Sequence, residues 1–312
     1  MGQVSYFLGI EFTWRHTDGH LSVCLTQQSF TETLIDSLGL QSSSVSSFTT
    51  PYLLGLVIDS IPHHEMDSEN HDKLCLQYQS LVGSLNWLAH TTRPDLSAVV
   101  SLLAQHQINP SQGHLDAAHY VVKYLANTKH LGIYFTSTKR SSMESFLYFP
   151  LPPQVLSIFD ANWGPQDASE NTSVLDLPLF VSRSMSAFYI DLLGPLHWLS
   201  KRQSITAIIS VEAEIYATSE CVKFLLELVQ ILDFLGVKHI FMPDVNVIYN
   251  DNQACVNWSC SCTTEGLHHI QMHENHVREN ILSEFIQICH VEGRINLDLY
   301  EGDKKIFVIL SI

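Results

Sequence analysis

The chain has 312 residues, 46% of them hydrophobic and 15% charged, a globular composition that excludes disordered, collagen-like and coiled-coil proteins. Sixteen basic and 32 acidic residues give a formal net charge of -16, which opposes long-range attraction to a polyanion unless basic groups cluster or metal ions intervene. The seven irregularly spaced cysteines do not suggest a disulfide framework and no segment is typical of a signal peptide or membrane span, so we expect an intracellular protein without membrane contact.

The first 140 residues predict a β-hairpin followed by a small helical module. β-Branched and aromatic residues between 6 and 28 flank a polar turn at 17–20 (TDGH), which is typical of a hairpin. A helix is expected next, with Thr31 as its cap and Gly39 as its end. Apolar residues at helical spacing predict three further helices, over 78–88, 94–103 and 111–125.

The second half predicts an α/β domain. The segment 141–154 contains the proline-rich sequence PLPP and is the expected linker between a module at 1–140 and a domain at 155–312. Beyond it, apolar strands alternate with helices. Strands are expected over 155–159, 188–193, 196–199 and 245–250, and a long helix over 212–235. Gly236 should end this helix as a left-handed C-cap.

Two aspartates follow apolar strands of this domain. Asp160 comes directly after 155–159, and Asp251 comes directly after 247–250. Two strands that each bring an aspartate to one end of a sheet are suited to hold a hard divalent cation, which takes oxygen ligands. Taken singly, each aspartate can equally serve as the cap or turn residue of the segment that follows it.

The long helix offers a third acid, and helix geometry chooses between two candidates. Glu212 and Glu214 lie about 200° apart around the helix axis, so they cannot both face the same site. Glu214 continues the apolar stripe that should pack on the sheet, whereas Glu212 suits a solvated position in the first turn. Because a carboxylate in a buried stripe is costly unless a metal or hydrogen bonds meet it, Glu214 is the predicted site residue.

Short motifs occur in a fixed order along nearly the whole chain. In the second half they are 160–164 (DANWG), 198–203 (WLSKRQ), 210–217 (SVEAEIYA), 251–254 (DNQA), and 269–270 (HI) with 277–279 (VRE). In the first half they are 7–11 (FLGIE), 78–85 (YQSLVGSL), 92–95 (TRPD), 109–110 (NP), His114 and 124–125 (YL). The first set resembles the RNase H domain of copia-type LTR retrotransposon polyproteins, and the second set resembles the connection region between the polymerase palm and that domain.

The resemblance implies a fold class and an activity. The fold is α/β: an RNase H-like mixed five-stranded sheet with helices on both faces, preceded by the β-hairpin and the small helical connection module. The activity is two-metal hydrolysis of the RNA strand of RNA:DNA hybrids, with Mg²⁺ as the cofactor and Mn²⁺ as a possible replacement. Bound metal ions would also offset the unfavourable net charge close to the site.

Site residues are carried over from the family by motif. The metal ligands implied are Asp160, Glu214, Asp251 and, in the displaced segment 296–300, Asp298. The hybrid's phosphates are expected to meet Lys201, Arg202 and Arg278, the first two in a turn between the third strand and the long helix. The alternative for Lys201 and Arg202 is a solvated turn without a ligand.

Departures from the family pattern leave a second interpretation open. No adjacent pair of aspartates, which polymerase chemistry needs, occurs in the chain, so it is not a complete reverse transcriptase, and the upstream polymerase part of the polyprotein is an expected partner. Asn162, Ala187 and Val211 replace usual family residues, and 301–312 no longer resembles the family. The alternative is a catalytically inactive retroelement remnant, or a scaffold that binds nucleic acid or a partner.

Histidines in the HI motif region offer a competing site. His269, His273 and His276 have i, i+4, i+7 spacing and could share a helix face that binds zinc. The pattern lacks the glutamate placement of HExxH and equally fits a partly exposed structural helix. The cysteines at 255, 260 and 262 lack zinc-knuckle spacing and are expected to be ordinary buried or surface thiols.

Overall fold

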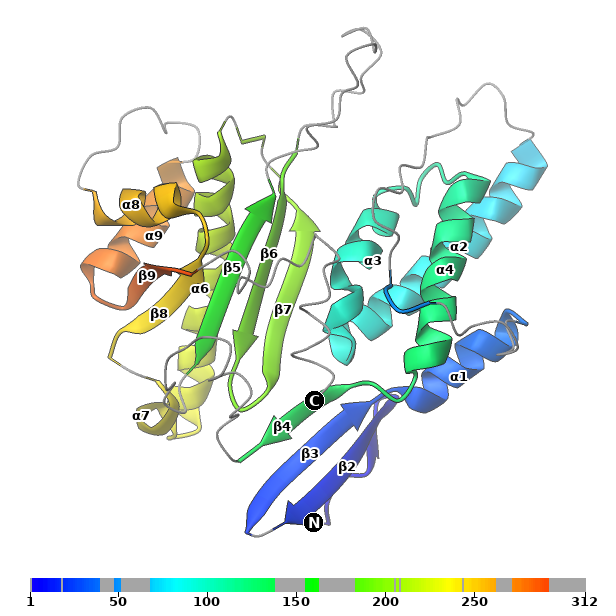
Figure 1. The fold of residues 1–312 in the computed structure, drawn as a ribbon, viewed down its shortest axis with the longest axis horizontal. Helices are drawn as coiled ribbons and strands as arrows, with labels where there is room; N and C mark the ends of the chain where they lie inside the picture. The colour runs from blue at the N-terminus through cyan, green and yellow to red at the C-terminus, as the bar shows by residue number, and fades with distance from the viewer. Residues whose placement is uncertain are drawn as a thin grey trace, which may run out of the picture. The chain divides into compact units, whose positions relative to one another are not determined.

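A computed structural model describes residues 2–17, 19–39, 48–51, 68–137, 155–162, 183–204, 206–207, 209–242, 244–261 and 271–291. These residues divide into two compact units, one before and one after the boundary at Thr138 and Lys139, here called unit 1 and unit 2. In the described ranges, unit 1 carries a four-stranded sheet and unit 2 a five-stranded sheet (Figure 1). No helix within these ranges is both long and apolar enough to cross a membrane.

The sheet of unit 1 is antiparallel throughout. Its strands, in the order β1-β2-β3-β4, are β1 (Tyr6–Phe7), β2 (Ile10–Thr17), β3 (His20–Thr26) and β4 (Ile133–Thr136). Thr17 pairs with His20, which confirms the predicted hairpin. A second tight turn joins β1 to β2, where Leu8 and Gly9 both have positive φ, as a two-residue type I′ turn requires. β4 pairs with β3 from the far end of the unit, a partnership that the sequence pattern did not predict.

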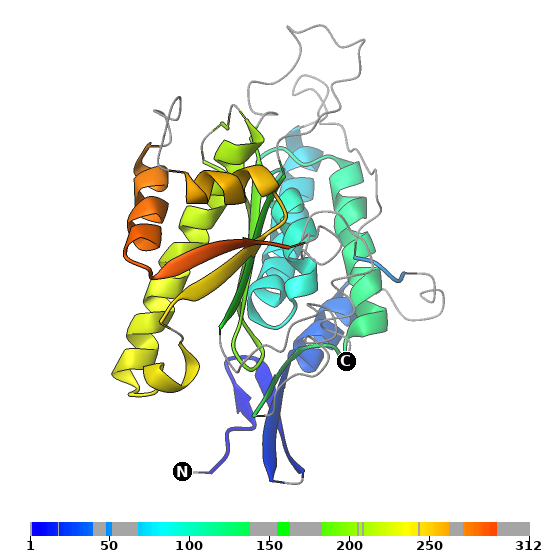
Figure 2. The ribbon, with the colours of Figure 1, turned by 60° about the vertical axis from the view of Figure 1, so that its left-hand side comes forward.

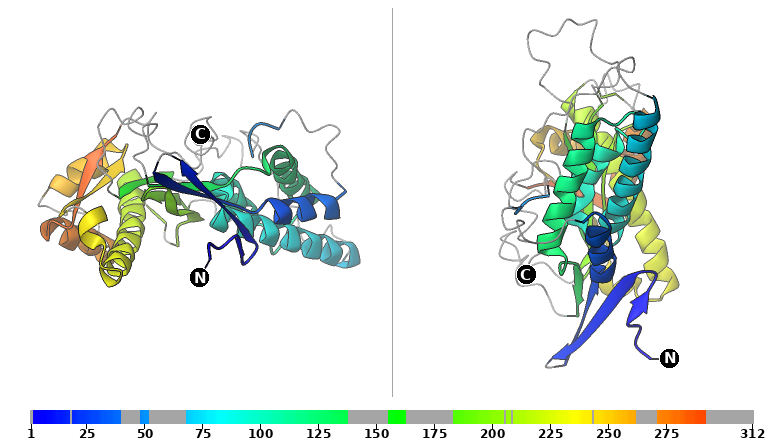
Figure 3. Two further views of the ribbon diagram at one scale, coloured as in Figure 1. Left: turned by 90° about the horizontal axis from the view of Figure 1, so that it is seen from below. Right: turned by 90° about the vertical axis from the view of Figure 1, so that its right-hand side faces the viewer.

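The other described elements of unit 1 are helices. They are α1 (Gln28–Ser37), α2 (Ser68–Thr91), the 3₁₀ turn η2 (Pro94–Leu96), α3 (Ser97–Ala104) and α4 (Gln112–Thr128). α2 and α4 lie side by side (Figure 3), and fully buried Tyr78, Leu85 and Leu125 lie in the core that they share with α1 and α3. The cap predicted for α1 is wrong, because Thr31 lies inside the helix, where its hydroxyl donates to the Gln27 carbonyl at 2.9 Å.

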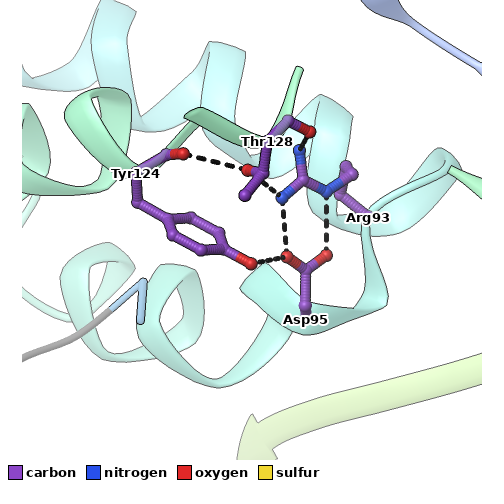
Figure 4. A network of polar contacts seen from close by, with 4 residues as sticks. All are labelled: Arg93, Asp95, Tyr124 and Thr128. Atoms are coloured by element: carbon purple, nitrogen blue, oxygen red, sulfur yellow. Dashed lines mark hydrogen bonds and ion pairs between the residues drawn. The ribbon is translucent and has the colours of Figure 1, made fainter. Parts of the chain in front are cut away.

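A buried ion pair ties the link after α2 to the end of α4 (Figure 4). Arg93 donates from Nε and Nη2 to the two carboxylate oxygens of Asp95, at 2.9 and 2.7 Å. Its guanidinium also donates to the carbonyl and hydroxyl oxygens of Thr128, at 3.0 and 2.8 Å, and the Tyr124 hydroxyl donates to Asp95 at 2.8 Å. Charge and hydrogen-bonding capacity are therefore matched in this network, although the side chains of Arg93 and Asp95 are only 3% and 7% exposed.

The sheet of unit 2 is mixed. Its strands, in the order β7-β6-β5-β8-β9, are β5 (Leu156–Asn162), β6 (Met185–Asp191), β7 (Pro195–Arg202), β8 (Asn246–Asn250) and β9 (Ile286–His290). β5, β6 and β7 form an antiparallel meander, whereas β8 runs parallel to β5 and β9 runs parallel to β8. The mixed five-stranded sheet expected of an RNase H-like fold is confirmed.

Helices of unit 2 share one hydrophobic core with this sheet. They are α6 (Ser210–Phe234), α7 (Lys238–Phe241), α8 (Gln253–Cys260) and α9 (Gln271–Leu282), and Figure 2 shows α6, α8 and α9 gathered beside the strands. Phe159, Ile215, Ile248, Trp258 and Val277 join the sheet, α6, α8 and α9 in a single buried cluster. α6 ends as predicted before Gly236, whose φ is +71°. Within the described part of unit 2 these helices share that one cluster, so a helix on the other face of the sheet stays a prediction.

Candidate functional site

The two predicted aspartates lie at equivalent positions on neighbouring parallel strands. The register between β5 and β8 pairs Ile158 with Tyr249. Asp160 lies two residues beyond Ile158, and Asp251 lies two residues beyond Tyr249. Because the strands are parallel, both aspartates lie toward the same end of the sheet. Asp160 is still within β5, because it also pairs with Ala187 of β6, whereas Asp251 directly follows β8. Tertiary structure thus brings together two acids that are far apart in the sequence.

Glu214 enters the same region from the beginning of α6. It is 3% exposed, and its carboxylate accepts a hydrogen bond from the Asn250 amide at the end of β8, which confirms its predicted inward orientation. Burial disfavours the charged carboxylate and holds its pKa well above the usual range, and the charges of Asp160 and Asp251 raise the pKa further. Asp160, Glu214 and Asp251, called the acidic cluster below, therefore lie within electrostatic reach of one another.

Glu212 does not occupy the solvated position predicted for it. Its residue exposure is 2%, and its carboxylate accepts a hydrogen bond from the backbone N–H of Ile209 at 3.4 Å. That contact satisfies the backbone N–H of the N-cap residue of α6, although Ile209 has no side-chain acceptor to complete a capping box. Glu212 therefore stabilises the helix terminus and is turned away from the acidic cluster by its place on the helix.

Asn250 is the residue at this site that the sequence analysis missed. Its side chain is fully buried at the end of β8, and its amide Nδ2 donates to Glu214 Oε2 and to the Phe159 carbonyl, both at 3.0 Å. Its Oδ1 accepts from the backbone N–H of Asn252 at 2.9 Å. A signal was present in the sequence, since an amide side chain that ends an apolar strand directly before an aspartate needs buried hydrogen-bond partners.

The chemistry of the acidic cluster fits a hard divalent cation. Three carboxylates supply the oxygen ligands that Mg²⁺ and Mn²⁺ prefer, and a cation would relieve the repulsion that raises the pKa of Glu214. Across the described ranges, no three His, Cys, Asp or Glu side chains are arranged closely enough to hold a metal ion as they stand. Asp298, the expected fourth ligand, lies outside the described residues.

Two of the basic residues predicted to contact the phosphates of a hybrid, Lys201 and Arg202, lie at the end of β7. Lys201 and Arg202 are the last two residues of this strand, so their expected placement in a turn is wrong, because pairing with β6 extends as far as Met185 and Arg202. Lys201 Nζ lies 2.7 Å from Glu220 Oε2, and Lys223 Nζ lies 2.6 Å from the other oxygen of the same carboxylate. The Lys201 side chain is 41% exposed and Arg202 is exposed, which leaves both accessible to an external phosphate.

Arg278 is held by contacts within unit 2. Its Nε donates to Glu274 at 3.0 Å, its Nη1 donates to the Ser261 carbonyl at 2.8 Å, and its guanidinium carbon lies 4.9 Å from the Trp258 ring centroid. The side chain is 20% exposed and links α9 to the end of α8. These contacts give Arg278 a structural role, and its contact with a hybrid stays a prediction.

The histidines of the competing zinc site are only partly described. His269 lies outside the described residues, as does Cys262. His273 Nδ1 lies 3.1 Å from the Ser219 hydroxyl, and its ring packs on Tyr216 with centroids 4.4 Å apart. Burial, followed by the charge of Lys223, lowers the pKa of both His273 and His276, which favours their neutral forms. Neither belongs to a metal-holding group in the part of the chain that the structure describes.

Known proteins similar to this chain include transposon polyproteins. No family model matches the chain. A retrovirus-related Pol polyprotein from transposon RE1 of Arabidopsis thaliana is 27% identical over 299 residues, which are 93% of this chain and 17% of that protein. A putative transposon Ty5-1 protein of Saccharomyces cerevisiae is 28% identical over 228 residues, 71% of this chain and 61% of the relative. The secreted RxLR effector protein 161 of Plasmopara viticola is 31% identical over 144 residues, 46% of this chain and 84% of that protein.

The alignments with the transposon proteins cover most of this chain but little of the Pol polyproteins. The chain spans 17% of the RE1 polyprotein and 13% of the related RE2 polyprotein of the same plant. Among solved structures, an RNase H1 from the halophilic archaeon Halobacterium salinarum NRC-1 is 12% identical, with a TM-score of 0.30, over 49% of this chain and 98% of that protein. The strand order β7-β6-β5-β8-β9 of unit 2 and the relatives in sequence support the RNase H-like fold.

Proposed function

Since this chain belongs, as one region, to the copia/Ty1-type retrotransposon Pol polyproteins, we propose that unit 2 is a ribonuclease that cleaves the RNA strand of RNA:DNA hybrids. The observation that supports this activity is the burial of Glu214 within reach of two further carboxylate charges. Such an arrangement lowers the stability of the fold unless a cation compensates it. A buried carboxyl group with a strongly raised pKa beside other acids is typical of functional sites.

In this proposal the acidic cluster binds Mg²⁺ or Mn²⁺, with Asp298 as a fourth ligand. Two such cations, held by these residues, would supply an activated water and stabilise the leaving 3′ oxygen. The chain's own contribution is to hold Asp160 within β5 and Asp251 directly after the adjacent strand β8, and to bury Glu214 away from bulk water. Lys201 and Arg202, at the end of β7, contact backbone phosphates of the hybrid, and Arg278 lies close to a third phosphate.

The proposal extends to the setting in which the enzyme acts. Cleavage of hybrid RNA is a step of reverse transcription, so the upstream polymerase part of the polyprotein is the proposed protein partner, and the cell interior is the proposed location. Unit 1 contains a sheet and a helical core of its own and resembles the connection region of those polyproteins. We propose that it joins the polymerase part to unit 2.

A cleavage assay tests the proposed activity. The full chain is incubated with an end-labelled RNA:DNA hybrid and Mg²⁺ or Mn²⁺, beside Asp160→Asn and Asp251→Asn. Because each substitution removes a metal ligand, we expect both variants to lose cleavage by at least about 100-fold. Glu212→Gln is the matched control, since this buried glutamate on the same helix turn caps α6 and should leave cleavage unchanged apart from a small loss of stability.

The alternative function is binding without catalysis. The net charge of -16 and the incomplete assembly of the acidic cluster among the described residues favour a remnant or a binding scaffold. That alternative predicts that the folded chain retains labelled hybrid in a filter-binding assay, or binds no nucleic acid, and releases no cleaved RNA with either metal. Metal-dependent cleavage that both aspartate variants lose would exclude it.

A further inference from the structure

We propose that Asn250 is a positioning residue that sets the affinity of the acidic cluster for divalent metal. The inference rests on the proposed function, because it assigns a role to a neighbour of the proposed ligands. Asn250 is not itself a ligand in this scheme. Its side-chain amide contacts the immediate surroundings of Asp160, Glu214 and Asp251 at once.

Each hydrogen bond of the Asn250 amide reaches a different part of the cluster. One goes to the carboxylate of Glu214, at 3.0 Å. A second goes to the carbonyl of Phe159, the residue before Asp160, also at 3.0 Å. The third comes from the backbone N–H of Asn252, the residue after Asp251, at 2.9 Å. A single buried side chain therefore restrains all three proposed ligands relative to one another.

The position of Asn250 in the sheet explains why such a restraint is needed. The parallel register between β5 and β8 extends to the pair formed by Ile158 and Tyr249, one residue before Phe159 and Asn250. Past that point the amide of Asn250 supplies a link from β8 to the β5 backbone. Since Asp160 and Asp251 lie just beyond, their separation depends on this side-chain link.

The neutral amide also suits the electrostatics of the site. A lysine or arginine at this position would neutralise the cluster and compete with a metal cation, and a carboxylate would add a further negative charge. An asparagine satisfies Glu214 with a donor, supplies an acceptor to Asn252, and leaves the net charge of the cluster unchanged. The cluster is thus held in place without losing its attraction for a cation.

The same strand offers a matched control. Asn246 begins β8, is 2% exposed, and donates from its own amide to the Phe285 carbonyl at 3.0 Å. It shares residue type, strand and burial with Asn250, and the carbonyl to which it donates belongs to the residue before β9 rather than to the acidic cluster. Replacing either residue by alanine removes a buried amide from β8, but only one replacement removes a contact with Glu214.

Calorimetric titration with Mn²⁺ tests the inference on the full chain, with folding checked by circular dichroism. We expect Asn250→Ala to weaken Mn²⁺ binding by about tenfold or more, the usual effect of losing a partner of a metal ligand, and Asn246→Ala to change it less than about twofold. If Asn250→Ala does not fold, Asn250→Ser, which keeps a polar group at the site, takes its place. In a Glu214→Gln background, Asn250→Ala should weaken Mn²⁺ binding little further, because the hydrogen bond between Asn250 and Glu214 is already altered.

The outcomes separate this inference from the proposed function. Equal Mn²⁺ affinity in Asn250→Ala and Asn246→Ala overturns the positioning role and leaves hybrid cleavage untouched. Selective weakening in Asn250→Ala, with no cleavage of hybrid by the wild-type chain, supports the positioning role and overturns the ribonuclease. If the wild-type chain binds no Mn²⁺ at all, both proposals are wrong.

Discussion

Unit 1 and unit 2 each bury charged side chains, but they satisfy them in opposite ways. Burial alone would lower the pKa of Arg93, yet the charge and hydrogen bonds of Asp95 outweigh burial and raise it. For Glu214, burial and the charges of Asp160 and Asp251 act in the same direction, and both disfavour the ionised carboxylate. The first network is complete as folded, whereas in the second the neighbouring charges oppose ionisation, and we call it the incomplete network. A buried charge that its neighbours match is typical of a structural pair, whereas a buried acid that its neighbours oppose is typical of a functional site.

The largest expected effect comes from breaking the complete network. Arg93→Ala leaves Asp95 buried without its guanidinium, so we expect the free energy of unfolding to fall by about 3–5 kcal/mol, with or without Mg²⁺. Urea unfolding followed by circular dichroism measures the loss. A double replacement by apolar residues, Arg93→Met with Asp95→Leu, should recover much of it, because no lone charge remains. A double variant that is less stable than Arg93→Ala would contradict this account.

A further buried titratable group of unit 1, His114, should make the stability of the fold depend on pH. Burial, with a smaller contribution from His106, lowers the pKa of His114 from 6.5 to about 4, and its Nδ1 accepts from the Ser111 backbone N–H at 2.9 Å. Because the unfolded chain binds a proton at His114 more tightly than the folded chain does, neutral His114 favours the folded state above about pH 6.5. This contribution to the free energy of unfolding is lost as the pH falls from 6.5 through 4. We expect a loss of about 2 kcal/mol, measured as urea midpoints from pH 7 to pH 4. His114→Asn should flatten this part of the profile, and an unchanged profile would show that other groups cause it.

The incomplete network should respond in the opposite direction to the complete one. Glu214→Gln removes a buried charge next to two like charges, so we expect it to raise the metal-free free energy of unfolding by about 1 kcal/mol. The same variant should lose most of the rise in melting temperature that saturating Mn²⁺ gives the wild-type chain. Thermal unfolding with and without Mn²⁺ measures both. A destabilised variant that keeps its response to metal would show that Glu214 is a structural residue.

The smallest expected effect on stability is that of replacing either of two lysines, Lys201 or Lys223, that pair with the same carboxylate. Lys201→Ala and Lys223→Ala each remove one partly exposed ion pair with Glu220, so each should change the free energy of unfolding by less than about 1 kcal/mol. If Lys201 contacts a phosphate of the hybrid, only its replacement weakens hybrid binding and lowers the slope of log affinity against log salt by about 1. If the two replacements change hybrid affinity and its salt dependence equally, Lys201 serves only the ion pair with Glu220.

Local patterns in the sequence determined many elements of this protein. Alternation of residue types and the TDGH turn were enough for the hairpin between β2 and β3, and apolar spacing with Gly236 was enough for α6. Helix geometry alone also predicted that Glu214 faces the two aspartates, although the same reasoning wrongly placed Glu212 in solvent. These features depend on residues within a few positions of one another, so the sequence displays their causes directly.

Tertiary structure decided which distant groups meet. Asn250 donates to a carbonyl 91 residues away, β4 pairs with a strand at the opposite end of unit 1, and strand pairing with β6 extends β7 through Lys201 and Arg202. Glu212 was expected in solvent, and the folded chain buries it instead. None of these partnerships leaves a periodic signal in the sequence, because a hydrogen-bond donor or a strand edge does not specify which distant partner will satisfy it until the chain has folded.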